Sequence, residues 1–269
     1  MTMNILKKTL AFLILDLCIV FIVEARFNEP EKKSNLENSV PSSIQSVSKE
    51  GSVNKAISDQ SFFLKKYESR ELLETDGNMI IAEFDRFIKD QGFSLQDIPK
   101  IKIQTEPSLI RVDSPNNAII VPYWDDLTND QKEIFKSWRG ENTEEFFVLL
   151  FNWFFIPHEL GHIINPMMHD VNPYQCEREA NEVAVKFFRT YPENIKKLDF
   201  LKESLTQVME ILPKIDFGIM SEAEYFNANY QKMGGKPNVY GYFQFKIILD
   251  VLNNQKDFSI KQYFDQQTD

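Results

Sequence analysis

The sequence predicts an α+β fold that is mainly helical, with a small antiparallel sheet, a hairpin, ahead of one central helix. Apolar residues recur at helical spacing along several stretches of the 269-residue chain. Two short apolar runs in its first half flank a strong turn signal, as the strands of a β-hairpin do. Hydrophobic residues make up 43% of the chain, and 23 residues are Phe. A chain of this length and composition can bury a complete, aromatic-rich core.

The first 25 residues have the pattern of a signal peptide. Lys7 and Lys8 precede an apolar run from Leu10 to Val23, and cleavage is expected after Ala25. That run is shorter than the roughly 20 residues that a membrane-spanning helix needs. We therefore expect a secreted or periplasmic protein with no stable membrane span after cleavage. An uncleaved N-terminal anchor is the alternative.

The rest of the chain divides into a linker and one domain. Residues 26–58 are rich in Ser, Asn, Glu and Lys and predict a flexible polar linker, so residues 59–269 form the globular domain. Cys176 is the one cysteine left after cleavage, which excludes an internal disulfide. The net charge of −10 argues against a nucleic-acid partner.

One or two helices and three strands are expected before the central helix. Residues 61–91 have apolar positions at helical spacing, with a break expected near Asp76-Gly77-Asn78. Residues 101–104 alternate in polarity like a strand. Residues 109–112 and 118–121 are apolar runs separated by Asp, Ser, Pro and Asn residues, and they predict the hairpin.

The central helix is expected to begin at Asn142, which can cap it, with Glu145 three residues on. The run Phe146 to Ile156 is almost wholly apolar and should be buried. Pro157 then either kinks one long helix or begins a new one. Asn165-Pro166 should end the helix.

The motif His-Glu-x-x-His follows directly after Pro157. His158 and His162 are four residues apart, so on a helix both imidazoles leave one face and can bind one zinc ion at about 2.0–2.1 Å each. Glu159 is poorly placed as a third ligand but can reach a water at the open metal position. It could accept the proton of that water during attack on a carbonyl. Gly161 leaves room for a partner to approach this face.

A third protein ligand is needed for a durable zinc site, and two residues qualify. His169 lies one residue beyond the third histidine of the metzincin pattern, and Asn165 replaces the glycine of that pattern. Glu177 lies on a predicted helix that starts at Asn172-Pro173, with Gln175 completing the cap.

Periodicity favours Glu177 as an inward-facing residue. The centre of the apolar face of its helix lies roughly 60° from Glu177, roughly 100° from Glu179 and roughly 160° from Glu182. That face is formed by Ala180, Val183, Ala184 and Phe187. The small alanines allow two helices to pack closely. A solvated acidic helix is the alternative.

The run His158-Glu159-Leu160-Gly161-His162, followed by Glu177-x-x-Ala180-Asn181-x-x-Ala184, resembles the gluzincin metallopeptidases. The resemblance covers roughly residues 153–188 and implies a zincin-like fold. It implies that His158, His162 and Glu177 bind zinc and that Glu159 is the catalytic base. Asn181 is implied to hold a ligand histidine by its other ring nitrogen, where many members of the family have Asp.

The C-terminal third is expected to hold a helix over residues 193–215, a loop at residues 234–238 and a buried helix from Tyr240 to Leu252. Gluzincins often stabilise the oxyanion with a Tyr, His or Arg from this part of the chain. Tyr240 and Tyr242 are the candidates here, and a simple packing role is the alternative for both.

The expected function is hydrolysis of a peptide or protein substrate by an exported zinc metallopeptidase. In enzymes of this kind an edge strand before the metal helix pairs with the extended substrate, although the hairpin here could also be purely structural. A non-catalytic metal-binding or interaction module is the alternative. The intact Glu159 favours the enzyme, because such a module has no need of a base.

Overall fold

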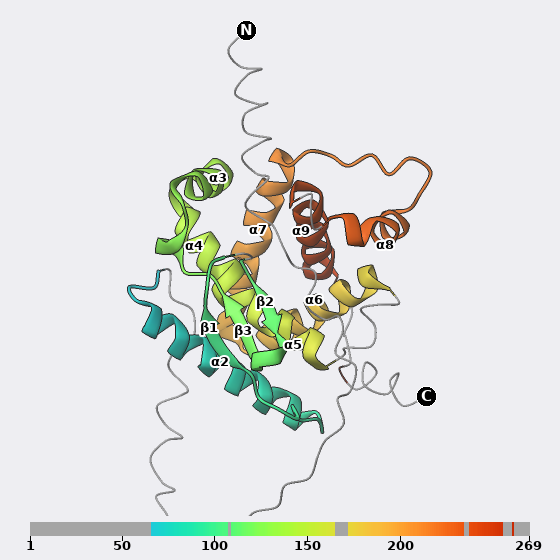
Figure 1. Ribbon diagram of the computed structural model, residues 1–269. Coiled ribbons are helices and arrows are strands. Elements are labelled where there is room, and N and C mark those ends of the chain that lie inside the picture. Colours follow the sequence, from blue (N-terminus) through green and yellow to red (C-terminus); the bar gives the residue numbers. More distant parts are fainter. Residues whose placement is uncertain (1–65, 107–108, 165–171, 234–236, 255–259, 261–269) are drawn as a thin grey trace, which may run out of the picture.

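The computed structural model describes residues 66–106, 109–164, 172–233, 237–254 and residue 260. Within these ranges the protein is mainly helical and has one small three-stranded sheet (Figure 1). This confirms the α+β class. The predicted signal peptide and linker lie outside the described residues, as does His169.

Helix α2 (Arg70–Asp90) is capped by Ser69 and continues without interruption through Asp76, Gly77 and Asn78, so the expected break is absent. Gly77 is instead a point of close approach, because a Cβ atom there would lie 2.7 Å from the Ile101 side chain. The Asn78 side-chain oxygen accepts a hydrogen bond from the Ile101 backbone N–H at 3.1 Å. Residues that are typical of a break thus dock the first strand.

The sheet consists of β1 (Lys100–Ile103), β2 (Arg111–Asp113) and β3 (Ala118–Val121), in the order β1-β3-β2. The predicted β2–β3 hairpin is confirmed as an antiparallel pair. The sheet as a whole is mixed, since β1 pairs with β3 in parallel, so the expectation of an antiparallel sheet was wrong. Strand β3 is uniformly apolar and occupies the central position of the sheet, so all four of its residues are buried.

Helix α3 (Asn129–Arg139) was not predicted, and it begins with a capping box formed by Thr128 and Gln131. The chain then continues through the short helix η5 (Gly140–Asn142) into α4 (Thr143–Phe147). Asn142 makes no side-chain capping bond, contrary to expectation. The chain is already helical there and needs no new start.

A π-helical segment, η6 (Val148–Phe154), leads into the motif helix α5 (Phe155–Ile164). The Phe155 N–H donates to the Leu150 carbonyl, five residues back. This wider turn lies two residues before Pro157, whose ring would clash with the carbonyl four residues earlier in a regular helix. The π-helical segment thus accommodates Pro157 inside α5, and the two together set the direction in which the motif helix enters the core.

The helical stretch Asn129–Ile164 is the one part of the described chain that is long and apolar enough to cross a membrane. Its most apolar window is 89% buried inside the protein. The run Phe146 to Ile156 is buried throughout, as expected.

Helix α6 (Pro173–Arg189) starts where predicted, with the Asn172 side chain accepting from the Gln175 N–H at 3.1 Å. The Gln175 side chain does not complete a capping box with Asn172, and its NH₂ group donates to Glu179 at 2.8 Å. The short helix η8 (Pro192–Asn194) and α7 (Ile195–Ile211) follow.

Two further helices complete the fold, α8 (Glu222–Met233) and α9 (Pro237–Asn253). Helix α8 was not predicted, although Ser221 and Glu224 exchange the hydrogen bonds of a capping box that is readable in the sequence. Helix α9 begins three residues before the expected Tyr240, so residues 237–238 belong to it rather than to a loop.

The core has two parts. The larger cluster is rich in phenylalanine and surrounds α5 and η6. The smaller cluster lies between α6, α8 and α9 and consists mainly of Phe226, Tyr230, Met233, Tyr240, Phe243 and Ile247. The smaller cluster places two tyrosines beside the N-terminal half of α6.

Candidate metal centre

Close packing of α5 against α6 positions the candidate site. A Cβ atom on Gly161 would lie 2.9 Å from the Ala180 Cα atom, so only glycine permits this approach. The expected apolar face of α6 is buried and packs inward. Glu177, one turn before Ala180, is carried against the motif helix and is 3% exposed.

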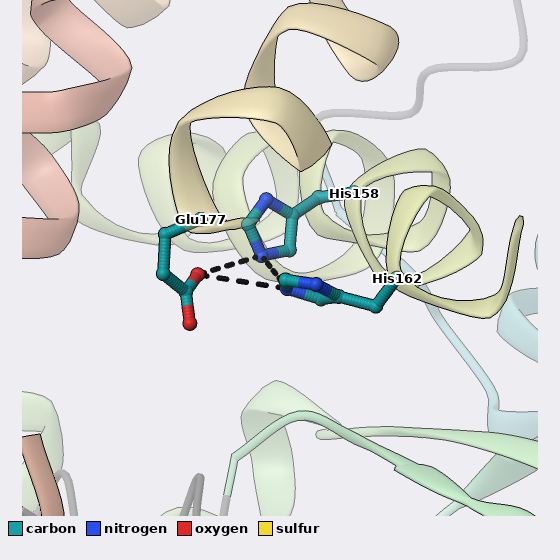
Figure 2. Close-up of side chains that lie close together, drawn as sticks. All are labelled: His158, His162 and Glu177. Atoms are coloured by element: carbon teal, nitrogen blue, oxygen red, sulfur yellow. Dashed lines mark hydrogen bonds and ion pairs between the residues drawn. The ribbon is translucent and has the colours of Figure 1, made fainter. Parts of the chain in front are cut away.

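Three side chains converge where the two helices meet, as Figure 2 shows for His158, His162 and Glu177. The two histidine Nε2 atoms are 3.1 Å apart. Oε2 of Glu177 lies 3.3 Å from Nε2 of His158 and 3.5 Å from Nε2 of His162. The structure therefore brings together two predicted ligands from one helix and the third from another.

The separations of these atoms fit a small metal ion. Ligands bound tetrahedrally at about 2.0–2.1 Å from zinc lie about 3.3–3.4 Å from one another. Oε2 of Glu177 is buried and accepts no hydrogen bond within the described residues. Two imidazole lone pairs that face each other also repel unless a proton or cation lies between them. His158, His162 and Glu177 thus form a buried group that could hold a metal ion.

The outer nitrogen of His158 is held by Asn181. The Asn181 side-chain NH₂ donates to the Glu177 backbone carbonyl at 2.9 Å, so its oxygen faces the imidazole. Nδ1 of His158 lies 2.9 Å from that oxygen and must donate to it. The proton of a neutral His158 is therefore on Nδ1, which leaves the Nε2 lone pair free for a metal.

Nδ1 of His162, the ring nitrogen that faces away from Glu177, lies beside Cys176. Cys176 was not among the predicted site residues. Sγ of Cys176 is 3.3 Å from Nδ1 of His162, and the thiol is buried. Cys176 and Asn181 therefore lie against the two imidazoles in the same way. The adjacency of Cys176 to Glu177 in the sequence was the one available signal.

Charge coupling within the group is strong. Burial alone would lower the pKa of His162, but the Glu177 carboxylate and the Cys176 side chain hold it well above its usual value. Burial alone would raise the pKa of Glu177, yet the two imidazoles hold it well below its usual value. In the absence of a metal, the group therefore favours a protonated imidazole beside an ionised carboxylate.

Glu159 lies apart from the three ligand atoms and is 4% exposed. Its carboxylate accepts a hydrogen bond from the Val112 backbone N–H of β2. Burial raises the pKa of Glu159, and the two nearby histidines counteract that shift only in part. Among the described residues β2 pairs with β3 alone, so the outer edge of the sheet and the Glu159 carboxylate lie beside the candidate metal group.

The two candidate tyrosines differ in position. The Tyr240 hydroxyl lies 3.2 Å from Oε1 of Glu177 and is buried. Tyr242 contacts Phe217 and Phe243 instead, because it projects from another side of α9. Tyr230 of α8 is buried beside Glu177 as well, and burial and the Glu177 charge both raise its pKa. Tyr230 was not among the predicted site residues, because α8 was not predicted.

Solvent reaches the group from one side. The His162 side chain is 17% exposed, whereas the His158 and Glu177 side chains are 2% and 4% exposed. The arrangement is therefore a mostly enclosed group of two histidines and one carboxylate, with the carboxyl group of Glu159 beside it. Comparison of the chain with protein-family models, with curated proteins and with solved structures gave no match, so the site is interpreted from its own geometry.

Proposed function

We propose that the protein is a zinc-dependent metallopeptidase with a zincin-like arrangement of its metal helix. The observation that carries this proposal is the convergence of the two histidine Nε2 atoms and one Glu177 oxygen at separations of 3.1–3.5 Å. Catalytic zinc sites commonly have three protein ligands and keep a further position open. Two imidazoles and one carboxylate are one such set.

A bound zinc ion would supply a Lewis acid that polarises the scissile carbonyl. The chain supplies the base: Glu159 follows the first ligand directly, and burial raises its pKa, which makes the carboxylate a stronger base. Asn181 orients His158, so that the ligand face of the ring is fixed before metal binds. These residues support hydrolysis by an attacking water rather than by a covalent intermediate.

The neighbouring sheet edge supports a peptide substrate. Among the described residues β2 is an edge strand that pairs only with β3, and the Val112 N–H of β2 donates to Glu159. An extended peptide could add to such an edge through backbone hydrogen bonds. Backbone pairing would place a scissile bond near the base and make modest demands on substrate sequence.

The test is the variant Glu159→Gln, which keeps the size of the side chain and removes the proton acceptor. We expect it to fold, to bind about one zinc ion per chain like the wild type, and to lose peptide hydrolysis by about 10²–10⁴-fold. Hydrolysis is measured on a peptide library beside zinc content.

Glu133→Gln is the matched control, because Glu133 loses the same charge on the exposed surface of α3. It should hydrolyse peptides like the wild type. Equal activity of Glu159→Gln and wild type would refute the proposed mechanism. Zinc binding with no hydrolysis by any form would favour a non-catalytic metal-binding module.

A further inference from the structure

We propose that Tyr240 and Gln244 of α9 are positioning residues that make Glu177 bind the metal through a single oxygen. This inference rests on the proposed metal binding at His158, His162 and Glu177. It assigns Tyr240 to the ligand carboxylate rather than to the oxyanion, which was its expected role. It also gives a role to Gln244, one helical turn farther along α9.

A directed chain of hydrogen bonds carries the proposal. The Tyr240 hydroxyl lies 3.2 Å from Oε1 of Glu177, and the Gln244 side-chain nitrogen lies 2.8 Å from the Tyr240 oxygen. An ionised carboxylate only accepts, so Tyr240 must give its one proton to Glu177. Its oxygen must then accept from the Gln244 NH₂ group. The polarity of the whole chain follows from the charge of Glu177.

The two carboxylate oxygens of Glu177 therefore differ in their contacts. Oε1 is engaged by Tyr240, while Oε2 faces the two imidazole nitrogens and accepts no hydrogen bond within the described residues. Tyr230 also hydrogen-bonds the Glu177 carboxylate. The terminal torsion of a glutamate is soft, so loss of the Tyr240 bond would weaken the hold on Oε1 and let the carboxylate offer both oxygens to the metal. Single-oxygen binding keeps the coordination number low and leaves room for substrate and water.

Burial strengthens the arrangement. Glu177, Tyr240 and Gln244 are 3%, 3% and 4% exposed, so their hydrogen bonds are shielded from competing water. Hydrogen bonds to a charged acceptor are also stronger than those between neutral groups. Tyr240 packs in the smaller core cluster with Phe226 and Tyr230, which holds its ring in place.

The same helix supplies a control residue. Tyr242 is only partly buried and contacts Phe217 and Phe243, away from Glu177. A Tyr→Phe change at position 242 therefore removes the same hydroxyl from the same helix without touching the metal group.

The experiment compares wild type, Tyr240→Phe, Gln244→Leu and Tyr242→Phe loaded with zinc or with cobalt(II). Zinc affinity is measured by competition with a chelator, and the coordination number from the visible absorption of the cobalt form. We expect Tyr240→Phe to lose about 10–100-fold in zinc affinity, as changes to groups that hold a ligand do. Its cobalt bands should shift and weaken, which indicates a higher coordination number.

Gln244→Leu should show a smaller loss and the same direction of spectral shift, and Tyr242→Phe should match the wild type. Wild-type affinity together with a wild-type cobalt spectrum in Tyr240→Phe would overturn the inference. If Tyr240→Phe fails to fold by circular dichroism, Gln244→Leu decides by the same two measurements. A wild type that binds neither metal would instead refute the proposed function, so the two failures are distinguishable.

Discussion

At the scale of single residues, the candidate centre brings together acceptor atoms that need a proton or a metal ion between them. His158 has its Nδ1 proton committed to Asn181, so its Nε2 presents a lone pair to His162 and Glu177. A proton on His162 satisfies this arrangement, and a metal ion does so as well. Proton and metal therefore compete for the same position between these atoms.

Metal affinity should depend on pH above the usual titration range of histidine. Burial lowers the pKa of His162, but the Glu177 carboxylate raises it more, so the net pKa is raised. In the metal-free protein, protonation of His162 therefore stabilises the fold fully below about pH 6.5, and this stabilisation is lost as pH rises through the raised pKa. Metal binding must release that proton. Apparent zinc affinity should therefore rise about tenfold per pH unit until the raised pKa is passed.

Chelator competition between about pH 6 and pH 8.5 measures this slope. Glu177 does not limit binding in that interval, because its pKa is lowered and its proton returns only at acid pH. An affinity that stays constant across the interval would contradict the proton–metal exchange.

Glu177→Ala should weaken zinc binding by orders of magnitude, because two histidines alone form an incomplete site. Glu182→Ala removes a carboxylate from the partly exposed side of the same helix, where it pairs with Arg178, and should leave affinity nearly unchanged. His169→Ala, outside the described residues, is predicted to be equally harmless. Zinc content after dialysis distinguishes these variants, and loss of zinc in His169→Ala alone would assign the third ligand to that histidine.

At the scale of elements, the centre depends on how closely α5 and α6 pack. The third ligand comes from α6, so its reach toward the histidines is set by the contact between Gly161 and Ala180. Pro157 and the π-helical segment before it determine the direction in which α5 enters this contact. The motif residues of α5 form the candidate site only because α6 lies close enough to bring Glu177 to the two histidines.

Gly161→Ala should separate the helices and weaken the metal group. The added Cβ would lie 2.9 Å from the Ala180 Cα atom, and neither backbone can move without shifting its helix. We expect a loss of about 1–3 kcal/mol in the free energy of unfolding, as for other overpacked cores, and weaker zinc binding. Urea denaturation and zinc titration provide the two measurements.

Gly241→Ala is the matched control, since no described atom lies within 4 Å of a Cβ atom at that position of α9. Alanine there should leave zinc binding unchanged and favour the helix by about 1 kcal/mol. Equal behaviour of the two variants would show that the α5–α6 contact tolerates expansion.

At the scale of the whole molecule, polar side chains between elements and the smaller core cluster hold together the parts around the centre. Asn78 attaches β1 to α2, and the Asn152 NH₂ group donates to the Pro122 carbonyl at 2.7 Å, which attaches the end of β3 to η6. The smaller cluster holds α8 and α9 against α6. A metal ion would add a direct link between α5 and α6.

Removal of the metal should therefore lower the thermal stability of the whole domain. A ligand that binds only the folded state at 1,000 times its Kd stabilises it by about 4 kcal/mol. For a domain of this size that corresponds to a rise in Tm of about 8–16 °C. Calorimetry with and without a strong chelator tests this, with Glu177→Ala as the variant in which the chelator should change nothing.

Much of the local structure was determined by the sequence itself. His158 and His162 need only a helix to share a face, and the apolar period of α6 was enough to turn Glu177 inward. The hairpin followed from a turn signal between two apolar runs. Such features depend on neighbours within a few residues, whose geometry is set by backbone sterics and local hydrogen bonds.

Contacts between distant segments were decided by the tertiary structure alone. The parallel pairing of β1, the unbroken course of α2 through Gly77 and the choice of Tyr240 over Tyr242 all depend on which surface meets which. The contact of Cys176 with His162 depends on how α6 packs against α5. Segments that are distant in the sequence pack so that few voids and few unpaired polar groups are buried. A local sequence pattern does not contain the information that determines this packing.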